Sequence, residues 1–507
     1  MNSHLAQAAP ARFAAESVDQ PASLRLRRLL GGTIFYALLV LLALVAIPYG
    51  SAEAWWEAFF ECAVFAISLL WIIEGLLGGS WLTGQRALWF PVLALIAYCI
   101  FQSLPLWSDG GGPTAASMGR KIWYAISADP FETRRFTLKL VALSIYGLLL
   151  TRYAASGKRL RLLVHVIIAV AMASALFGIL RQTTQREIGF ILPFLRKGLG
   201  YGQFINQNHF AFLMEMALGL VLGLLVGRGV RRDRMLIYVA TLLPILTALV
   251  LSYSRGGLLG MLGQLIFVAL LFTILPPASE TGGAQQVNAG SAPERLRRLG
   301  RSLPVRLALA GCLVLAMAVG VLLVGGEPMM VKLETVQTEL NAPDAAARQN
   351  ASRKEIWRAT WELIKAHPLA GVGFSGYWAA IPTYHDASGE LTPQQAHNDY
   401  LELLASGGII GVALVCWFAY VFYRRVRERL RAKDTFCRAI CFGALAGIFG
   451  VAVHSIVDFG LHITINALVF VVLLVLATTD CQEREANSHT VRRHPNPVKS
   501  GSTALNV

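Results

Sequence analysis

Long apolar runs recur along most of the chain, separated by shorter polar stretches. About 20 consecutive apolar residues span the roughly 30 Å of a bilayer's hydrocarbon core, and each run is long enough to do so. A spanning helix also satisfies its own backbone hydrogen bonds in lipid. The pattern predicts an all-α, polytopic membrane bundle with about twelve transmembrane helices. The runs are 30–48, 55–78, 87–105, 136–153, 161–181, 207–227, 235–253, 256–276, 305–325, 403–423, 436–456 and 463–479.

The charged residues between the runs indicate an orientation. Lysine and arginine gather in alternate connections, such as 228–234 and 424–433, whereas the short connections 49–54 and 457–462 contain neither. Connections rich in basic residues stay in the cytoplasm. We therefore expect both termini in the cytoplasm and the intervening connections on the opposite, outer side of the membrane.

These spans define a simple organisation. We expect a cytoplasmic N-terminal tail at 1–29, spans 1–9 at 30–325 and a large periplasmic loop at 326–402. Spans 10–12 then occupy 403–479, and a cytoplasmic tail occupies 480–507. Within the loop, residues 353–366 have an apolar face with helical spacing, and Pro368 should end that helix.

Composition agrees with a membrane protein. Of the 507 residues, 55% are hydrophobic and 15% are charged, against about 25% charged in soluble domains. The net charge of +15 is explained by basic residues that flank spans. No basic stripe with interleaved aromatic residues occurs, so we do not expect a nucleic-acid partner.

Two residues at the predicted outer surface are candidates for chemistry. His397 lies where the large loop meets the tenth span, and a histidine there could accept a proton from an attacking hydroxyl or could only cap the helix. Arg255 lies in the short turn between spans seven and eight. A guanidinium beside apolar runs is costly without a partner, which a phosphate would supply, although snorkelling to the interface is the alternative.

Further polar groups lie at helix ends. Asn206, Asn208 and His209 open the sixth span, where they could bind sugar hydroxyls and phosphate or could cap the helix. His454, Asp458 and His462 recur every four residues. This spacing suits a metal or a buried relay. Because the set straddles a predicted turn, however, we expect a hydrogen-bonded polar end of the bundle and no metal.

Several motifs, in this order and on one side of the membrane, resemble those of the O-antigen ligase and O-antigen polymerase family. The resemblance extends over about residues 100–470, with an O-antigen ligase-related region at about 200–420. The motifs are Asn206-Gln207-Asn208-His209-Phe210-Ala211, Ser254-Arg255-Gly256-Gly257, Gly371-Val372-Gly373-Phe374, His397-Asn398 followed after nine residues by Gly408-Ile409-Ile410-Gly411, and Val457-Asp458-Phe459 with His462 and Asn466-Ala467.

The resemblance implies a glycosyltransferase that uses neither metal nor cofactor. Its donor would be a glycan on undecaprenyl diphosphate, and the acceptor hydroxyl would lie on the periplasmic face. His397 would activate the acceptor and Arg255 would bind the diphosphate. Arg181 and Arg358 suit the same electrostatic task by location alone. Asn206, Asn208, His209 and Asn398 are candidates for substrate binding.

The acceptor stays open at this stage. It could be lipid A–core for a ligase, another lipid-linked repeat for a polymerase, or a protein hydroxyl. The segment from Val457 to Ala467 slightly favours an exopolysaccharide polymerase. A transporter or flippase for lipid-linked sugars is the alternative, and it predicts functional charges near the bilayer midplane. A non-catalytic scaffold is a third possibility, for which His397 would be dispensable.

Overall fold

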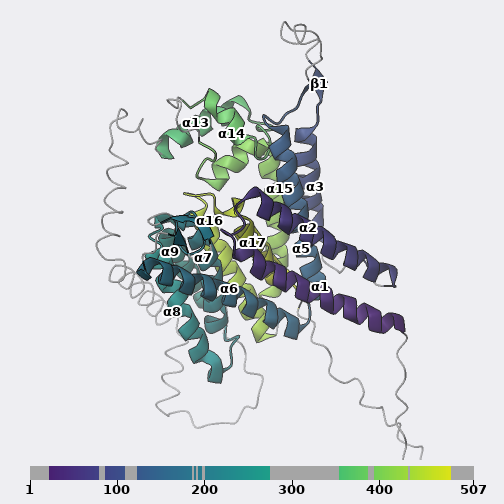
Figure 1. The fold of residues 1–507 in the computed structure, drawn as a ribbon, viewed down its shortest axis with the longest axis vertical. Helices are drawn as coiled ribbons and strands as arrows, with labels where there is room; N and C mark the ends of the chain where they lie inside the picture. Colours follow the sequence, from purple (N-terminus) through teal and green to yellow (C-terminus); the bar gives the residue numbers. More distant parts are fainter. Residues whose placement is uncertain are drawn as a thin grey trace, which may run out of the picture.

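A bundle of helices makes up the structure, a computed structural model (Figure 1). It describes residues 22–78, 81, 86–108, 123–184, 188–189, 192–196, 200–274, 353–385, 393–431 and 434–480. The longer helices are α1 (Ala22–Ala46), α2 (Ala54–Leu76), α3 (Arg86–Ser103), α5 (Pro130–Tyr153), α6 (Gly157–Thr184), α7 (Gln207–Val226), α8 (Met235–Leu251), α9 (Arg255–Ile274), α13 (Arg353–Ala366), α15 (Asp399–Arg429), α16 (Thr435–His454) and α17 (Thr464–Thr478).

Short elements fill some of the connections. Strands β1 (Trp107–Ser108) and β2 (Trp123–Tyr124) form one antiparallel pair, and β3 (Ile188–Gly189) and β4 (Leu192–Arg196) form another. The remaining elements are the helix α14 (Tyr377–Ala380) and the 3₁₀ turns η1 (Arg232–Arg234), η2 (Ile381–Thr383) and η3 (Gly460–His462).

The helices fit the predicted membrane spans closely. Eight of the described helices are long and apolar enough to cross a membrane, and three shorter apolar helices cover Ala87–Ser103, Arg255–Leu271 and Thr464–Thr478. Together they coincide with eleven of the twelve predicted runs. The chain is therefore a multi-pass helical membrane protein, as predicted. The run 305–325 lies outside the described residues, so the count of twelve stays a prediction.

The centre of the bundle is the packing of α7 against α16. Every residue of α7 from His209 to Leu224 is buried. A Cβ on Gly219 would lie 2.3 Å from the backbone nitrogen of Gly447, and one on Gly223 would lie 2.1 Å from the Cα of Gly443. Small residues let membrane helices approach until their backbones touch. These glycines therefore hold the two helices together beneath the polar cluster described below.

The two ends of the bundle differ in their polar groups. At one end, the site end, connections predicted to lie outside contact the ends of other spans: Thr464 Oγ1 donates to the Ser51 carbonyl at 2.8 Å and Gln203 Nε2 to the Ala46 carbonyl at 3.0 Å. Helices α13 and α14 lie over this end (Figure 1). The other end, the arginine-rich end, carries Arg152, Arg161, Arg234, Arg425 and Arg429. The compartment that each end faces stays a prediction.

The amphipathic helix expected in the large loop is present. Helix α13 spans Arg353–Ala366 and buries Ile356, Ala359, Thr360, Leu363 and Ile364. It ends two residues before Pro368, as predicted. Trp357 of α13 reaches across to the segment that precedes α15, where its Nε1 donates to the Ala396 carbonyl at 3.0 Å. The loop helix therefore contacts the backbone next to His397.

Helix α15 departs from the predicted span 403–423. It begins at Asp399 and is interrupted at Gly408, where φ is 60° and ψ is −166°. The loop that follows α13 fills the interruption, since Val372 N donates to the Ala405 carbonyl and Ile409 N to the Pro368 carbonyl, both at 2.9 Å. The prediction of one uninterrupted span over 403–423 was therefore wrong at Gly408. A break is tolerated at membrane depth when protein satisfies the freed backbone groups.

Candidate functional site

Asp458, in the turn between α16 and η3, is the centre of a polar cluster at the site end. Its side chain is 1% exposed. Oδ2 accepts a hydrogen bond from Asn208 Nδ2 and lies 3.6 Å from Arg353 Nη2. Oδ1 accepts from Phe459 N at 2.9 Å and lies 3.6 Å from His397 Nδ1. One carboxylate therefore connects α7, the loop helix α13, His397 and the α16–η3 turn.

This carboxylate keeps its charge. Burial raises the pKa of Asp458, but its interaction with His397 and the nearby His209 and His454 outweigh burial and hold the pKa at about 2. Asp458 is therefore ionised at neutral pH. A buried anion of this kind attracts and orients protonated or hydrogen-bonding partners.

The backbone holds His397 in an uncommon conformation. Its φ is 49°, in the left-handed region that non-glycine residues rarely adopt. Hydrogen bonds fix both flanks: Ala396 N donates to Glu402 Oε2 at 2.9 Å, and Asn398 Oδ1 caps α15 by accepting from Tyr400 N. Strain of this kind persists where the surrounding structure imposes it, often at functional sites.

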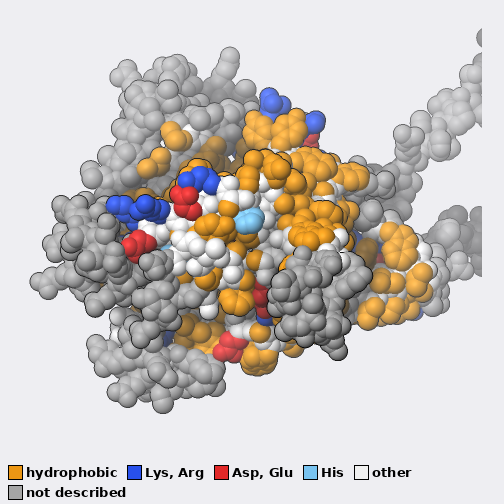
Figure 2. Space-filling view, turned by 90° about the horizontal axis from the view of Figure 1, so that it is seen from above, with side chains coloured by type: hydrophobic (Ala, Val, Ile, Leu, Met, Phe, Trp, Pro, Cys, Tyr) orange, Lys and Arg blue, Asp and Glu red, His pale blue; other side chains and the backbone are white. Residues whose placement is uncertain are grey.

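The imidazole of His397 has one side turned inward and one open. Nδ1 faces Asp458, and the ring meets Phe459 edge-on with centroids 4.8 Å apart. A third of the side chain, 33%, stays exposed. Seen from above, histidine surface shows near the middle of the molecule, between charged side chains and a hydrophobic area (Figure 2). The ring can therefore meet a substrate while a carboxylate supports it from behind.

A chain of hydrogen bonds extends from Asp458 to the start of α9. Ser254 Oγ donates to Asn208 Oδ1 at 2.8 Å and accepts from Gly257 N at 3.0 Å. Ser254 thus caps α9, whose first residue is the half-buried Arg255. We predicted Arg255 in the turn before the helix, whereas it occupies the first helical position. The Asn208 and Ser254 motifs, distant in sequence, thus contact each other, and Asn208 connects both to Asp458.

A second histidine–carboxylate pair lies deeper, within the bundle. His454 Nδ1 lies 2.9 Å from Glu215 Oε1, both side chains are 0% exposed, and Phe212 stacks on the imidazole with centroids 3.9 Å apart. A Cβ on Gly256 would lie 2.4 Å from the His454 ring, and one on Gly260 would lie 2.8 Å from Glu215. The glycines that follow Arg255 therefore make room for this dry pair.

Two of the substrate-binding candidates cap helices. The Asn206 side chain accepts from Asn208 N at 2.8 Å and caps α7, which agrees with the capping alternative. Asn398 caps α15. Their side-chain oxygens are thus engaged in backbone contacts. His209 is buried, and its ring lies edge-on to Phe459 with centroids 5.0 Å apart.

The other predicted arginines lie in different surroundings. Arg181, near the end of α6, donates to the Gly202 carbonyl at 2.9 Å, in the loop that leads to α7. Arg358 is exposed on α13. The arginine that reaches Asp458 from α13 is instead Arg353, which we did not single out. Its only sequence signal is a basic residue at the start of an amphipathic loop helix.

The set His454, Asp458 and His462 does not form one helix face. Helix α16 ends at His454, the chain turns, and the three side chains reach different partners: Glu215, Asn208 and Glu402. The described residues contain no group of three or more His, Cys, Asp or Glu side chains that could hold a metal. These three residues, which recur every four positions, thus belong to a hydrogen-bonded polar end of the bundle.

His462 also contacts Phe459, with ring centroids 5.8 Å apart. Its Nε2 is 3.3 Å from Glu402 Oε1, and Lys139 Nζ donates to its backbone carbonyl at 2.8 Å. Burial, Lys139 and His209 lower the pKa of His462 to about 3. The imidazole is therefore neutral at neutral pH. Glu402 also holds Ala396 N, so this contact reaches the backbone next to His397.

Residues 240–416 match the family model described as O-antigen ligase. The chain carries an O-antigen ligase domain. The match confirms the family that the motifs predicted, over a shorter stretch than the expected 200–420. The O-antigen ligase domain includes Arg255, α13, His397 and the break at Gly408, whereas Asn208 and Asp458 lie outside it. The comparison with curated proteins found no match. An O-antigen ligase domain within a bundle of membrane helices indicates a membrane enzyme that transfers glycans.

Proposed function

We propose that the protein transfers a glycan from undecaprenyl diphosphate to an acceptor hydroxyl at the site end, on the periplasmic face of the inner membrane. The acceptor oxygen bonds to the anomeric carbon as the glycosyl–phosphate bond breaks, and the bond's electron pair leaves with the diphosphate. The acceptor proton passes to His397. The observation that carries this proposal is the contact of a partly open His397 with the buried, ionised Asp458.

Asp458 has two tasks in this scheme. It holds Nδ1 of His397 inward, so that the opposite side of the ring faces the acceptor. It also stabilises the imidazolium that forms when the proton arrives. A base positioned in this way contributes about 10²–10⁴-fold to rate. Asn208 fixes the orientation of the carboxylate through its amide.

Arg255 is the proposed ligand of the diphosphate, because it follows the Ser254 turn that is hydrogen-bonded to the cluster. Arginines stabilise a leaving diphosphate best when they are fixed and partly desolvated. Arg353 adds positive charge beside Asp458. Arg181 acts indirectly, because it donates a hydrogen bond to the loop at Gly202. Arg358, which is exposed on α13, remains a candidate for binding the outer part of the donor. His209 and Asn398 would line the sugar site.

This chemistry needs no metal or cofactor, because the diphosphate is already a good leaving group. The partners are the lipid-linked donor, membrane lipid and either a glycan or lipid A–core acceptor. The polyprenyl tail of the donor explains why a sugar-transferring enzyme lies within a membrane bundle.

The alternative is a transporter or flippase of lipid-linked sugars, and the interrupted helix α15 is the observation that favours it. The loop at 368–373 fills this interruption, however, and the partly open charged groups gather at the site end. Both features favour a fixed catalytic site.

Complementation of a gene deletion tests the proposal. The strains carry wild type, His397→Ala, Arg255→Ala or the control His367→Ala, which removes an exposed histidine from the same loop. Surface glycans are compared on gels at matched protein levels. We expect loss of transfer with His397→Ala and Arg255→Ala only. Accumulated polymer on the lipid carrier identifies a ligase, and accumulated single repeats identify a polymerase. Full function of the His397→Ala strain contradicts the proposal and favours the transporter or scaffold.

A further inference from the structure

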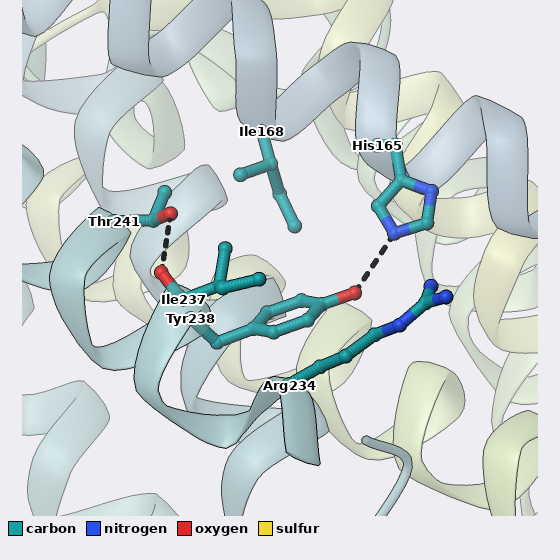
Figure 3. A pocket seen from close by; sticks show the side chains of 6 residues that line it. All are labelled: His165, Ile168, Arg234, Ile237, Tyr238 and Thr241. Atoms are coloured by element: carbon teal, nitrogen blue, oxygen red, sulfur yellow. Dashed lines mark hydrogen bonds between the residues drawn. The ribbon is translucent and has the colours of Figure 1, made fainter. Parts of the chain in front are cut away.

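A cavity of about 210 Å³ lies between α6 and α8, near the arginine-rich end. It is lined by His165 and Ile168 from α6, by Arg234 just before α8, and by Ile237, Tyr238 and Thr241 from α8 (Figure 3). None of these residues takes part in the proposed glycan transfer. The cavity is therefore independent of the cluster around Asp458.

The polar groups of this cavity gather at one side. His165 Nε2 and the Tyr238 hydroxyl are 2.8 Å apart. The Arg234 side chain extends alongside Tyr238 toward His165 (Figure 3). Arg161, one turn before His165, adds a second guanidinium, which lies 4.4 Å from the centre of the Phe436 ring and interacts electrostatically with His165. One cation, Arg234, and two hydrogen-bonding groups therefore line the cavity, and a second cation, Arg161, lies one helical turn away on α6.

These two cations differ from others at the same end. Arg152 pairs with Glu74 at 2.6 Å, and Arg429 pairs with Asp480. Within the described part of the chain, no carboxylate lies within ion-pair distance of Arg161 or Arg234. Both arginine side chains are exposed, so an anion from outside the chain can reach them and accept charge-assisted hydrogen bonds.

The rest of the cavity and its surroundings are apolar. Ile168, on α6, and Ile237, on α8, supply apolar lining (Figure 3). On α8, Leu236, Ile237 and Leu243 are all more than half exposed, as expected for side chains that face lipid. The site thus offers cations at the helix start and an apolar surface toward the middle of the membrane. This order matches that of a phospholipid, whose charged headgroup lies above its chains.

We propose that this cavity binds an anionic phospholipid of the leaflet at the arginine-rich end. The phosphate lies between Arg161 and Arg234 and accepts from Tyr238 or His165. An acyl chain lies along Ile168 and Ile237. Basic pockets between membrane helices bind anionic headgroups on the side of the membrane to which the positive-inside rule assigns these arginines. The bound lipid contacts both helices and thereby links α6 to α8.

Binding of defined lipids to the full-length protein in neutral detergent tests this proposal. Phosphatidylglycerol, phosphatidylcholine and inorganic phosphate are added separately, and retained lipid and the melting temperature are measured. We expect phosphatidylglycerol alone to bind and to raise the melting temperature. The double variant Arg161→Gln/Arg234→Gln should bind it about tenfold more weakly or worse, because charge-assisted hydrogen bonds are lost.

The control variant Arg424→Gln/Arg427→Gln removes the same charge from exposed positions near the end of α15, and it should bind like wild type. Ile237→Trp fills the apolar part without changing charge and should also weaken binding, which covers the case in which the arginine variants fail to fold. The proposal is overturned if phosphatidylcholine binds as well as phosphatidylglycerol. It is also overturned if the control variant loses as much phosphatidylglycerol binding as Arg161→Gln/Arg234→Gln. A phosphate effect equal to that of phosphatidylglycerol would instead identify a free-anion site and overturn the lipid assignment.

Discussion

Two histidine–carboxylate pairs lie near the end of α16, one through His454 and one through Asp458. They differ in how much of the histidine is exposed to solvent. Asp458 pairs with His397, whose side chain is 33% exposed, whereas Glu215 pairs with a His454 that is 0% exposed. The same two side-chain types therefore face a possible substrate in one case and a packed interior in the other. Residue type alone does not identify a catalytic histidine, because solvent access and the surrounding backbone decide what the group can reach.

The largest effect should come from the open pair. We expect His397→Ala to lower glycan transfer by about 10²–10⁴-fold, since a positioned base is lost. The melting temperature should stay near that of wild type because the side chain is partly exposed. Transfer is measured with purified protein and a lipid-linked donor.

His397→Gly sharpens this test. Glycine adopts the observed φ of 49° without strain, so the variant should be at least as stable as His397→Ala and equally inactive. If either variant transfers glycan at the wild-type rate, His397 is not the base and the comparison of the two pairs fails.

The dry pair should show the opposite profile. Glu215→Ala leaves a buried imidazole nitrogen without its hydrogen-bonding partner and opens a cavity, which together cost about 2–5 kcal/mol. We expect a large fall in melting temperature, with near-normal transfer per folded molecule. The double change Glu215→Leu/His454→Phe should recover much of the stability. A stable but inactive Glu215→Ala protein would instead give the buried pair a role in transfer.

A smaller effect should follow from Gly256→Ala, which links the two pairs. The new Cβ would lie 2.4 Å from the His454 ring, and such overpacking costs about 1–3 kcal/mol. Because Arg255 is the preceding residue, transfer should fall together with stability. Gly32→Ala on α1 is the matched control, since its Cβ meets nothing within 4 Å. Equal behaviour of the two variants would contradict close packing of the Ser254 turn on His454.

The smallest effect concerns pH. The pKa of Asp458 is about 2 in the folded protein, below the value of about 3.9 for an unfolded aspartate. The unfolded state therefore takes up the proton first, and the stability from this ionised carboxylate is complete above about pH 4. It falls as the pH drops from about 4 toward 2. Unfolding of wild type and Asp458→Asn across this range measures it, and parallel acid profiles would show that Asp458 has no depressed pKa.

Much of the fold could be predicted because its signals are local. Each membrane helix is a run of apolar residues, and α13 has an apolar face with helical period. The break in α15 was missed because Gly408 looks like any glycine of an apolar run. Only its neighbours explain it, since a Cβ there would lie 2.3 Å from the Leu369 carbonyl oxygen.

The candidate site was predicted in part. The sequence singled out His397, Arg255 and Asn208 from motifs and from their place at helix ends. It assigned Asp458 to a possible metal set and missed Arg353. These roles depend on pairings between residues far apart, such as Asn208 with Asp458, which are separated by 250 positions. Spacing along a single helix carries no information about such contacts.

The sequence by itself determined the membrane helices, the cluster of arginines in alternate connections, and the location of His397 just before α15. Hydrophobic period and charge placement act within one helix or connection, so they can be read without knowledge of neighbours. Only the tertiary structure decided which histidine is open and which is dry. It also decided which carboxylate supports His397 and which arginines, among the described residues, have no carboxylate within ion-pair distance. Access and pairing arise when α7, α9, α13 and α16 pack together, and no single segment contains that information.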